Sequence, residues 1–257
     1  MKTIYTGLLV LLIFALTNFS LSAQENPPKI RYMVWEVQVN PLQQEKLLNA
    51  IKSQNAFLKE QNHPFANITQ YTNEGYLWYS IPFTNYADID KIEAASQKLW
   101  KEHSEKSKEL QELFDGAFNT IGGFILEYQP ELSIRAAERD IPANGKRFRF
   151  FEKFYIKYGK EKEFEELVKR YKELRETNGF KDDFLTMYPA FAPEMNVVYF
   201  IDETGSNAAE HFSDIEKHWE IFGQEGEELW NDVKQVIEKI ETRTGLIDYD
   251  VSYFPEE

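Results

Sequence analysis

Two stretches of the chain begin with an apolar run that alternates like a β-strand and continue into an amphipathic helix. The runs are residues 30–39 (IRYMVWEVQV) and 146–156 (KRFRFFEKFYI). Both alternating faces of the first run are largely apolar, which predicts a strand covered on both sides. Each following helix has an apolar stripe, formed by Leu47, Leu48, Ile51 and Leu58 in the first stretch and by Phe164, Leu167, Val168, Tyr171 and Leu174 in the second.

The same order of elements continues in both stretches. A pair of strands follows each helix, at 67–72 and 76–83 around a turn at Asn73-Glu74-Gly75, and at 184–188 and 196–202 around a loop from Pro189 to Pro193. A longer helical region comes next, and it opens with the similar words DIDK and DIEK. The last strand of each copy ends in a similar word, YQPE at 128–131 in the first copy and YFPE at 253–256 in the second. Trp35-Glu36 of the first copy matches Phe151-Glu152 of the second, at a spacing of 116 residues. The spacing between matching segments is larger in the later parts of the two copies.

This order predicts an α+β protein built from two βαββαβ units, each of them ferredoxin-like. The units are expected at 29–131 and 146–255, with a polar linker at 132–145. A four-stranded sheet with helices on one face leaves its other face to be covered. We therefore expect the two sheets to pack on each other as a barrel within one chain.

In this element order and self-similarity the chain resembles the dimeric α+β barrel superfamily, in which two ferredoxin-like units join sheet to sheet. The resemblance is to NIPSNAP-type and antibiotic-biosynthesis-monooxygenase-type domains, and the same scaffold carries haem-degrading monooxygenases, chlorite dismutases and dye-decolourising peroxidases. It implies an internal duplication and a monomer that forms a pseudo-dimer, or a weak homo-oligomer. It implies no particular reaction, because one fold serves many chemistries.

Composition narrows the classes of function. The 257 residues include 42% hydrophobic residues and no cysteine, which excludes disulfide scaffolds and zinc sites built on thiolates. The net charge of -14 disfavours nucleic acid and anionic lipid as partners. Residues 1–23 combine Lys2, an apolar run and a small-residue end at Ala23, which is the pattern of a secretory signal peptide. We expect an exported protein of the periplasm or the extracellular medium, without a membrane span after the signal is removed.

The histidines offer few sites for a metal or a cofactor. His211, Asp214 and His218 share a helix face, but seven residues rise about 10.5 Å along a helix, which is too far for two imidazoles on one metal. No metal site is expected. His103 borders the apolar side of its helix. The resemblance leaves haem open as a cofactor, with His103, His211 or His218 as its axial ligand.

The candidate catalytic residues are Glu36 and Glu152, which take matching places in the two copies at the spacing of 116 residues. A carboxylate among aromatic side chains has its pKa raised by desolvation unless a cation meets it, and such a group can act as a general acid or base. The alternative is an ion pair with Arg31, Arg147 or Arg149, or a position at the edge of the sheet that is open to water. Ligand-binding candidates are the residues Trp35, Trp78, His103, His218 and Trp219.

Three hypotheses of function remain. The first is an exported protein that binds a small apolar or aromatic molecule, or interacts with a partner, without catalysis. The second is a cofactor-independent monooxygenase or isomerase that acts on a small aromatic or apolar substrate. The third is a haem-binding protein. The sequence contains no nucleophile elbow and no glycine-rich phosphate loop that would decide among them.

Overall fold

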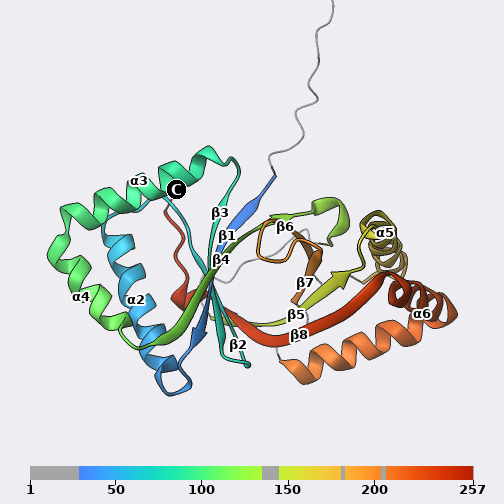
Figure 1. Ribbon diagram of the computed structural model, residues 1–257. Coiled ribbons are helices and arrows are strands. Elements are labelled where there is room, and N and C mark those ends of the chain that lie inside the picture. Colours follow the sequence, from blue (N-terminus) through green and yellow to red (C-terminus); the bar gives the residue numbers. More distant parts are fainter. Residues whose placement is uncertain (1–28, 135–144, 181–182, 204–206, 257) are drawn as a thin grey trace, which may run out of the picture.

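The computed structural model describes residues 29–134, 145–180, 183–203 and 207–256. The proposed signal peptide and most of the proposed linker lie outside these residues. The first unit contains β1 (Arg31–Val39), α2 (Gln44–Glu60), β2 (Ile68–Thr72), β3 (Tyr76–Phe83), α3 (Ala87–Glu102), α4 (Ser104–Phe114) and β4 (Phe118–Tyr128). The second contains β5 (Lys146–Ile156), α5 (Glu161–Thr177), β6 (Asp183–Phe191), β7 (Val197–Glu203), α6 (Ala208–Val236) and β8 (Ile237–Asp248). The helices of the two units lie on opposite sides of the strands (Figure 1).

The eight strands form one closed barrel in the order β1-β3-β2-β8-β5-β7-β6-β4. Within it, each unit keeps the ferredoxin-like order, β4-β1-β3-β2 or β8-β5-β7-β6. Two antiparallel seams, β2 with β8 and β4 with β6, join the units. The predicted fold class is therefore confirmed, and the sheets meet along their edges as well as across the interior.

Local signals explain most of the element boundaries. The side chain of Asn40 accepts a hydrogen bond from the backbone of Leu42, at a short 3-10 helix that precedes α2. Helix α5 ends at Thr177, and Gly179 follows with a φ of 75°, which glycine adopts without strain. The predicted loop from Pro189 to Pro193 is wrong in its first part. Strand β6 continues to Phe191 because β4 pairs with it, and a register shift accommodates Pro189.

Each unit sends its last residues across to the other unit. After β4, the hydroxyl of Ser133 donates to the Gln129 carbonyl and accepts from the Thr186 backbone N–H on β6. After β8, Ser252 makes the same two bonds, to the Asp248 carbonyl and from the Thr69 backbone N–H on β2. Leu132 and Ile134 thereby join the core of the second unit, and Val251 that of the first.

The equivalent bulges in β1 and β5 fix the register between the units. The shift falls between Gln38 and Val39 in β1 and between Tyr155 and Ile156 in β5, so the spacing is 117 residues and not 116. Because side chains alternate along a strand, an error of one residue moves every side chain to the other face. Glu36 is therefore equivalent to Lys153. The proposed equivalence of Glu36 and Glu152 is wrong.

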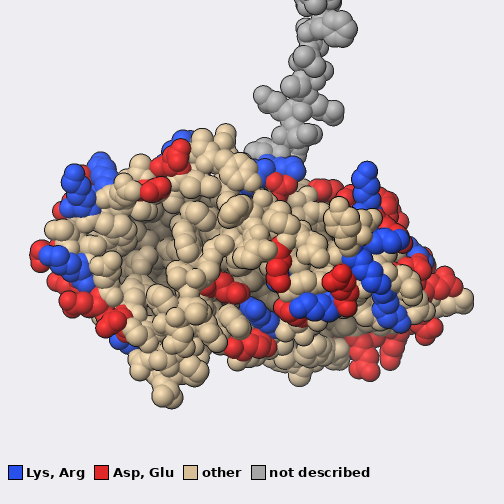
Figure 2. Space-filling view, in the orientation of Figure 1, with Lys and Arg blue, Asp and Glu red and all other residues tan. Residues whose placement is uncertain are grey.

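Acidic and basic side chains are interspersed over the helices at both ends of the face shown in Figure 2, and the surface is hollowed beside the helices of the first unit. Among the residues that the structure describes, no helix is both long enough and apolar enough to cross a membrane.

Candidate functional site

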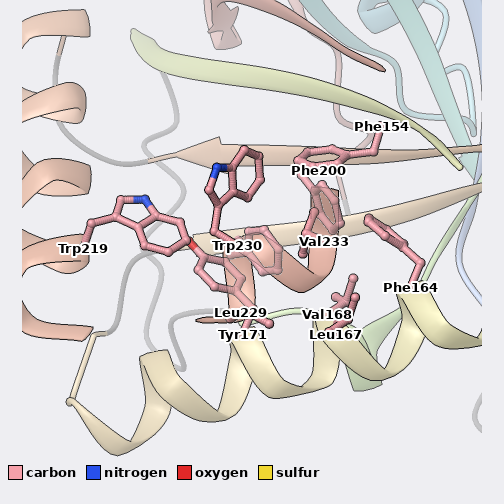
Figure 3. Close-up of a pocket in the computed structure, with 11 residues that line it drawn as sticks. Phe154, Phe164, Leu167, Val168, Tyr171, Phe200, Trp219, Leu229, Trp230 and Val233 are labelled. Atoms are coloured by element: carbon pink, nitrogen blue, oxygen red, sulfur yellow. The ribbon is translucent and has the colours of Figure 1, made fainter. Parts of the chain in front are cut away.

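An aromatic cavity lies between the sheet of the second unit and its two helices, and we call it the helix–sheet cavity. Its volume is about 70 Å³. It is lined by Phe154, Phe184 and Phe200 from the sheet, Phe164, Leu167, Val168 and Tyr171 from α5, and Trp219, Leu229, Trp230 and Val233 from α6. Figure 3 shows these side chains turned toward one another across the space between the helices and the strands.

The aromatic rings in the cavity wall pack against one another in stacked, tilted and edge-to-face arrangements. Tyr171 and Trp219 stack with ring centroids 6.2 Å apart, and Trp219 meets Trp230 at 6.3 Å. On the sheet side, the rings of Phe184 and Phe200 stack at 5.0 Å. Such offset and edge-to-face arrangements are favourable for aromatic rings.

Helix α6 is broken where it covers this cavity. Gly223 has a φ of 52° and a ψ of -132°, outside the helical region, between the turns that carry Trp219 and Trp230. One turn later, a Cβ on Gly226 would lie 2.6 Å from the Cβ of Phe222, so the helix packs closely around its break. Gly223 therefore divides α6 into a half that bears Trp219 and a half that bears Trp230.

Charged groups are buried beside the cavity. Arg175 is completely buried on α5, and its guanidinium is 3.6 Å from the carboxylate of Asp202 on β7. The same guanidinium donates to the hydroxyl of Tyr171, and burial raises the pKa of that phenol to about 12. Tyr171 therefore stays protonated at neutral pH and presents the one hydroxyl group in the cavity wall.

The side chain of Glu152 belongs to this buried group and does not point into the barrel interior. It pairs with Phe200 across the sheet, so both side chains lie on the face toward the helices. Burial, with a further contribution from the negative charge of Asp202, raises the pKa of Glu152 from its ordinary 4.5 to about 8. A carboxyl group with this pKa exchanges its proton in the physiological range, which suits a general base.

We expect the Glu152→Gln substitution to stabilise the protein, and more so at high pH. With its pKa raised in the folded state, Glu152 contributes most to stability below about pH 4.5, and that contribution is lost as the pH rises toward 8. The variant should gain about 1–3 kcal/mol at pH 8 and close to nothing at pH 5. Urea unfolding at both pH values measures this, with exposed Glu173→Gln as the control. An equal gain at both values would contradict it.

The other candidates fall into separate places. Glu36 and Trp78 lie together inside the barrel, where the indole N–H donates to the Glu36 carboxylate over 2.6 Å. Arg243, rather than any of the arginines considered from the sequence, completes the ion pair of Glu36 at 2.7 Å. Trp35 faces the helices of the first unit, with its ring 6.1 Å from that of Tyr79.

The histidines lie outside the helix–sheet cavity. His103 separates α3 from α4, and its ring meets the edge of Phe57. His218 is buried on α6 with its ring 3.8 Å from that of Phe180, and His211 is fully buried against Phe150. Of the ligand-binding candidates, Trp219 alone lines this cavity.

These positions do not fit haem. No histidine lines the helix–sheet cavity as the structure describes it, and about 70 Å³ is far below the roughly 300–1,000 Å³ of sites that enclose larger ligands. Among the described residues, no group of three or more His, Cys, Asp or Glu side chains is placed to hold a metal ion.

Sequence reasoning missed Tyr171, Arg175 and Asp202 as a polar group beside the cavity. Tyr171 appeared only as part of an apolar stripe. The available signal was Arg175, which follows Tyr171 by one helical turn and so lies on the buried side of α5. An arginine on that side needs a buried acceptor, and Asp202 is one that the fold supplies.

No protein-family model matches the sequence, and no curated protein matches it. Solved structures do share its fold. A proposed monooxygenase from Lactobacillus acidophilus is 11% identical with a TM-score of 0.54, covering 88% of this chain and 97% of that one. One from Fusobacterium nucleatum is 12% identical with a TM-score of 0.54, covering 86% and 94%. An anthrone oxidase-like protein is 12% identical with a TM-score of 0.55, covering 87% and 92%.

Similarity at 11 to 12% identity establishes a shared fold and leaves the activity open. It agrees with the strand order of the closed barrel, in which each half keeps the ferredoxin-like arrangement. The chain therefore has the fold of the dimeric α+β barrel superfamily, with both halves of the barrel supplied by one polypeptide.

Proposed function

We propose that the protein binds a small aromatic molecule in the helix–sheet cavity. The observation that carries the proposal is the continuous wall of aromatic and aliphatic side chains with the single Tyr171 hydroxyl in it. Burial against such walls contributes favourable binding free energy to a flat apolar ligand. A polar atom on the ligand would be oriented by a hydrogen bond with the Tyr171 hydroxyl.

The ligand requires the cavity to widen. An apolar cavity of roughly 150 Å³ accepts benzene, which is about twice the volume present here. The break at Gly223 supplies a way to widen, because the half of α6 that carries Trp219 can move outward. Binding should therefore change the environment of Trp219.

The test is a titration with phenol, indole and 1-naphthol, followed by tryptophan fluorescence and thermal melting. Val233→Phe should fill the cavity and abolish the response, whereas Leu167→Ala should enlarge it and tighten binding of the largest ring. Trp35→Phe, outside the cavity, is the control for fluorescence. The proposal fails if the wild type shows no response at millimolar ligand, or if Val233→Phe responds like the wild type.

A second candidate function, cofactor-independent oxygenation, is supported by Glu152, whose charge acts on Tyr171 of the cavity wall, and by the proposed monooxygenases that share the fold. A CH₂ group between aromatic rings would lose a proton to the Glu152 carboxylate. The resulting carbanion would be oxidised by dioxygen, so that CH₂ and O₂ become C=O and H₂O. Oxygen uptake with anthrone tests this. Glu152→Gln should lower the rate by about 10²–10⁴-fold and leave binding intact.

We also propose that the protein is exported after removal of residues 1–23 and that its two units arose by duplication. The sequence pattern of the first 23 residues supports export. The matching bonds of Ser133 and Ser252 support duplication. N-terminal sequencing of the protein from the periplasm or the medium should begin at Gln24, and a membrane-bound chain that keeps Met1 would contradict export.

A further inference from the structure

A second cavity, distinct from the helix–sheet cavity, opens inside the barrel near the ends of β1 and β5. We call it the barrel-mouth cavity, and its volume is about 140 Å³. Trp78 and Tyr199 are among the aromatic residues that line it. The charged residues that line it are the cations Lys153 and Arg243 and the acidic residues Glu36, Glu152, Glu194 and Glu241. Aromatic and charged groups thus meet in one cavity.

The two units contribute opposite kinds of side chain at equivalent positions. At the spacing of 117 residues Glu36 matches Lys153, and the strand pairs place Trp78 opposite Glu36 and Tyr199 opposite Lys153. A symmetric homodimer would carry the same residue at both positions. With both halves in one chain, an anion and a cation can stand at the two equivalent positions.

Most of these side chains are held in place. The Glu36 carboxylate accepts from Trp78 and Arg243, and the Arg243 guanidinium lies 3.9 Å from the centre of the Tyr76 ring. The side of the cavity toward Glu36 is therefore a fixed framework.

Lys153 has a less constrained partner. Its ammonium group binds the carboxylate of Glu194, which also accepts from the Tyr155 hydroxyl at 3.2 Å. Glu194 lies in the loop between β6 and β7, and its side chain is 47% exposed, whereas that of Lys153 is 19% exposed. A carboxylate from an exposed loop side chain is thus paired with a cation that lies on strand β5 of the barrel.

We propose that the barrel-mouth cavity binds a small aromatic carboxylate. In the free protein, the carboxylate of Glu194 occupies the position that the ligand carboxylate takes in the complex. The ligand carboxylate replaces that of Glu194 on Lys153 and Tyr155. Its ring then packs against Trp78 and Tyr199. Arg243 lies diagonally from Lys153 across the β5–β8 pair, and its charge is paired with Glu36. Glu241 lies directly opposite Lys153 and is paired with Lys239 at 2.6 Å, so Lys153 is the cation that receives the ligand carboxylate.

The test uses benzoate as the probe and benzamide as its uncharged control, titrated by calorimetry into the full mature chain. Benzoate should bind at least tenfold more tightly than benzamide. Lys153→Met should weaken benzoate binding at least tenfold, and Lys160→Met on the surface should leave it unchanged. Glu194→Gln should tighten benzoate binding several-fold, because it removes the competing carboxylate.

The Glu194 variant keeps the test independent of folding, since a damaged protein would not bind more tightly. Equal binding of benzoate and benzamide, absence of benzoate binding at millimolar concentration, or weaker binding by Glu194→Gln would overturn the proposal. Val233→Phe, which fills the helix–sheet cavity, should leave benzoate binding unchanged. If Val233→Phe lost benzoate binding, the ligand would lie in the helix–sheet cavity, and the assignment to the barrel mouth would be overturned.

Discussion

Replacing Arg175 by methionine should lower the free energy of unfolding by about 3–5 kcal/mol. Arg175 is completely buried, pairs with Asp202 at 3.6 Å, and packs its guanidinium 5.4 Å from the Phe184 ring centre. Methionine retains much of the volume and removes the charge. Asp202 then stays buried near Glu152 without the positive charge of Arg175. The cost of keeping this negative charge buried lowers the free energy of unfolding.

Arg170→Met on the same helix is the matched control. Arg170 pairs with Asp232 at 3.1 Å at the surface, where both side chains are substantially exposed, so its loss should cost less than about 1 kcal/mol. A double variant, Arg175→Met with Asp202→Asn, should recover part of the stability, because it also removes the buried negative charge of Asp202. Urea unfolding at pH 7 measures all three. Equal losses for Arg175→Met and Arg170→Met would show that burial of the ion pair does not matter.

The order of elements was predictable from the sequence because periodicity and turn chemistry act locally. Three local signals each specify structure within a few residues. They are the apolar run at 30–39, the helix cap at Asn40 and the helix end at Asn178-Gly179. Closure of the barrel was predictable because both faces of the first strand are apolar. The extension of β6 to Phe191 was not, since it depends on pairing with β4, more than sixty residues earlier in the chain.

The site was harder to predict, because it depends on register. Matching the letters of Trp35-Glu36 to Phe151-Glu152 placed Glu152 on the same face as Glu36, whereas the bulges set a spacing one residue longer. Strand β5 also reverses the usual distribution of charged and apolar side chains between solvent and interior. Its charged positions Arg149 and Lys153 face the barrel interior, where Arg149 binds Gln70 and Glu203. Alternation alone would assign such positions to the solvent.

The seam between β2 and β8 should be the most sensitive point of barrel closure. It has three pairs, Gln70 with Ile247, Tyr71 with Leu246 and Thr72 with Gly245. A Cβ at Gly245 would lie 2.3 Å from the carbonyl oxygen of Tyr71 and 2.9 Å from the Cα of Thr72. Both contacts are with backbone, which cannot rotate away. Alanine at this position must therefore push the two strands apart.

We expect Gly245→Ala to lower the free energy of unfolding by about 3 kcal/mol, the upper part of the usual range for overpacking, because the strain falls on a seam and not on one side chain. Gly123→Ala is the control, since its Cβ would approach nothing closer than the Val34 carbonyl at 3.8 Å. Thermal melts compare the two. Acrylamide quenching of Trp78, measured with the other tryptophans changed to phenylalanine, should increase in Gly245→Ala alone, because an opened seam admits the quencher to the barrel interior. A Gly245→Ala protein that melts with the wild type would mean that β2 and β8 are not packed as closely as their backbone contacts require.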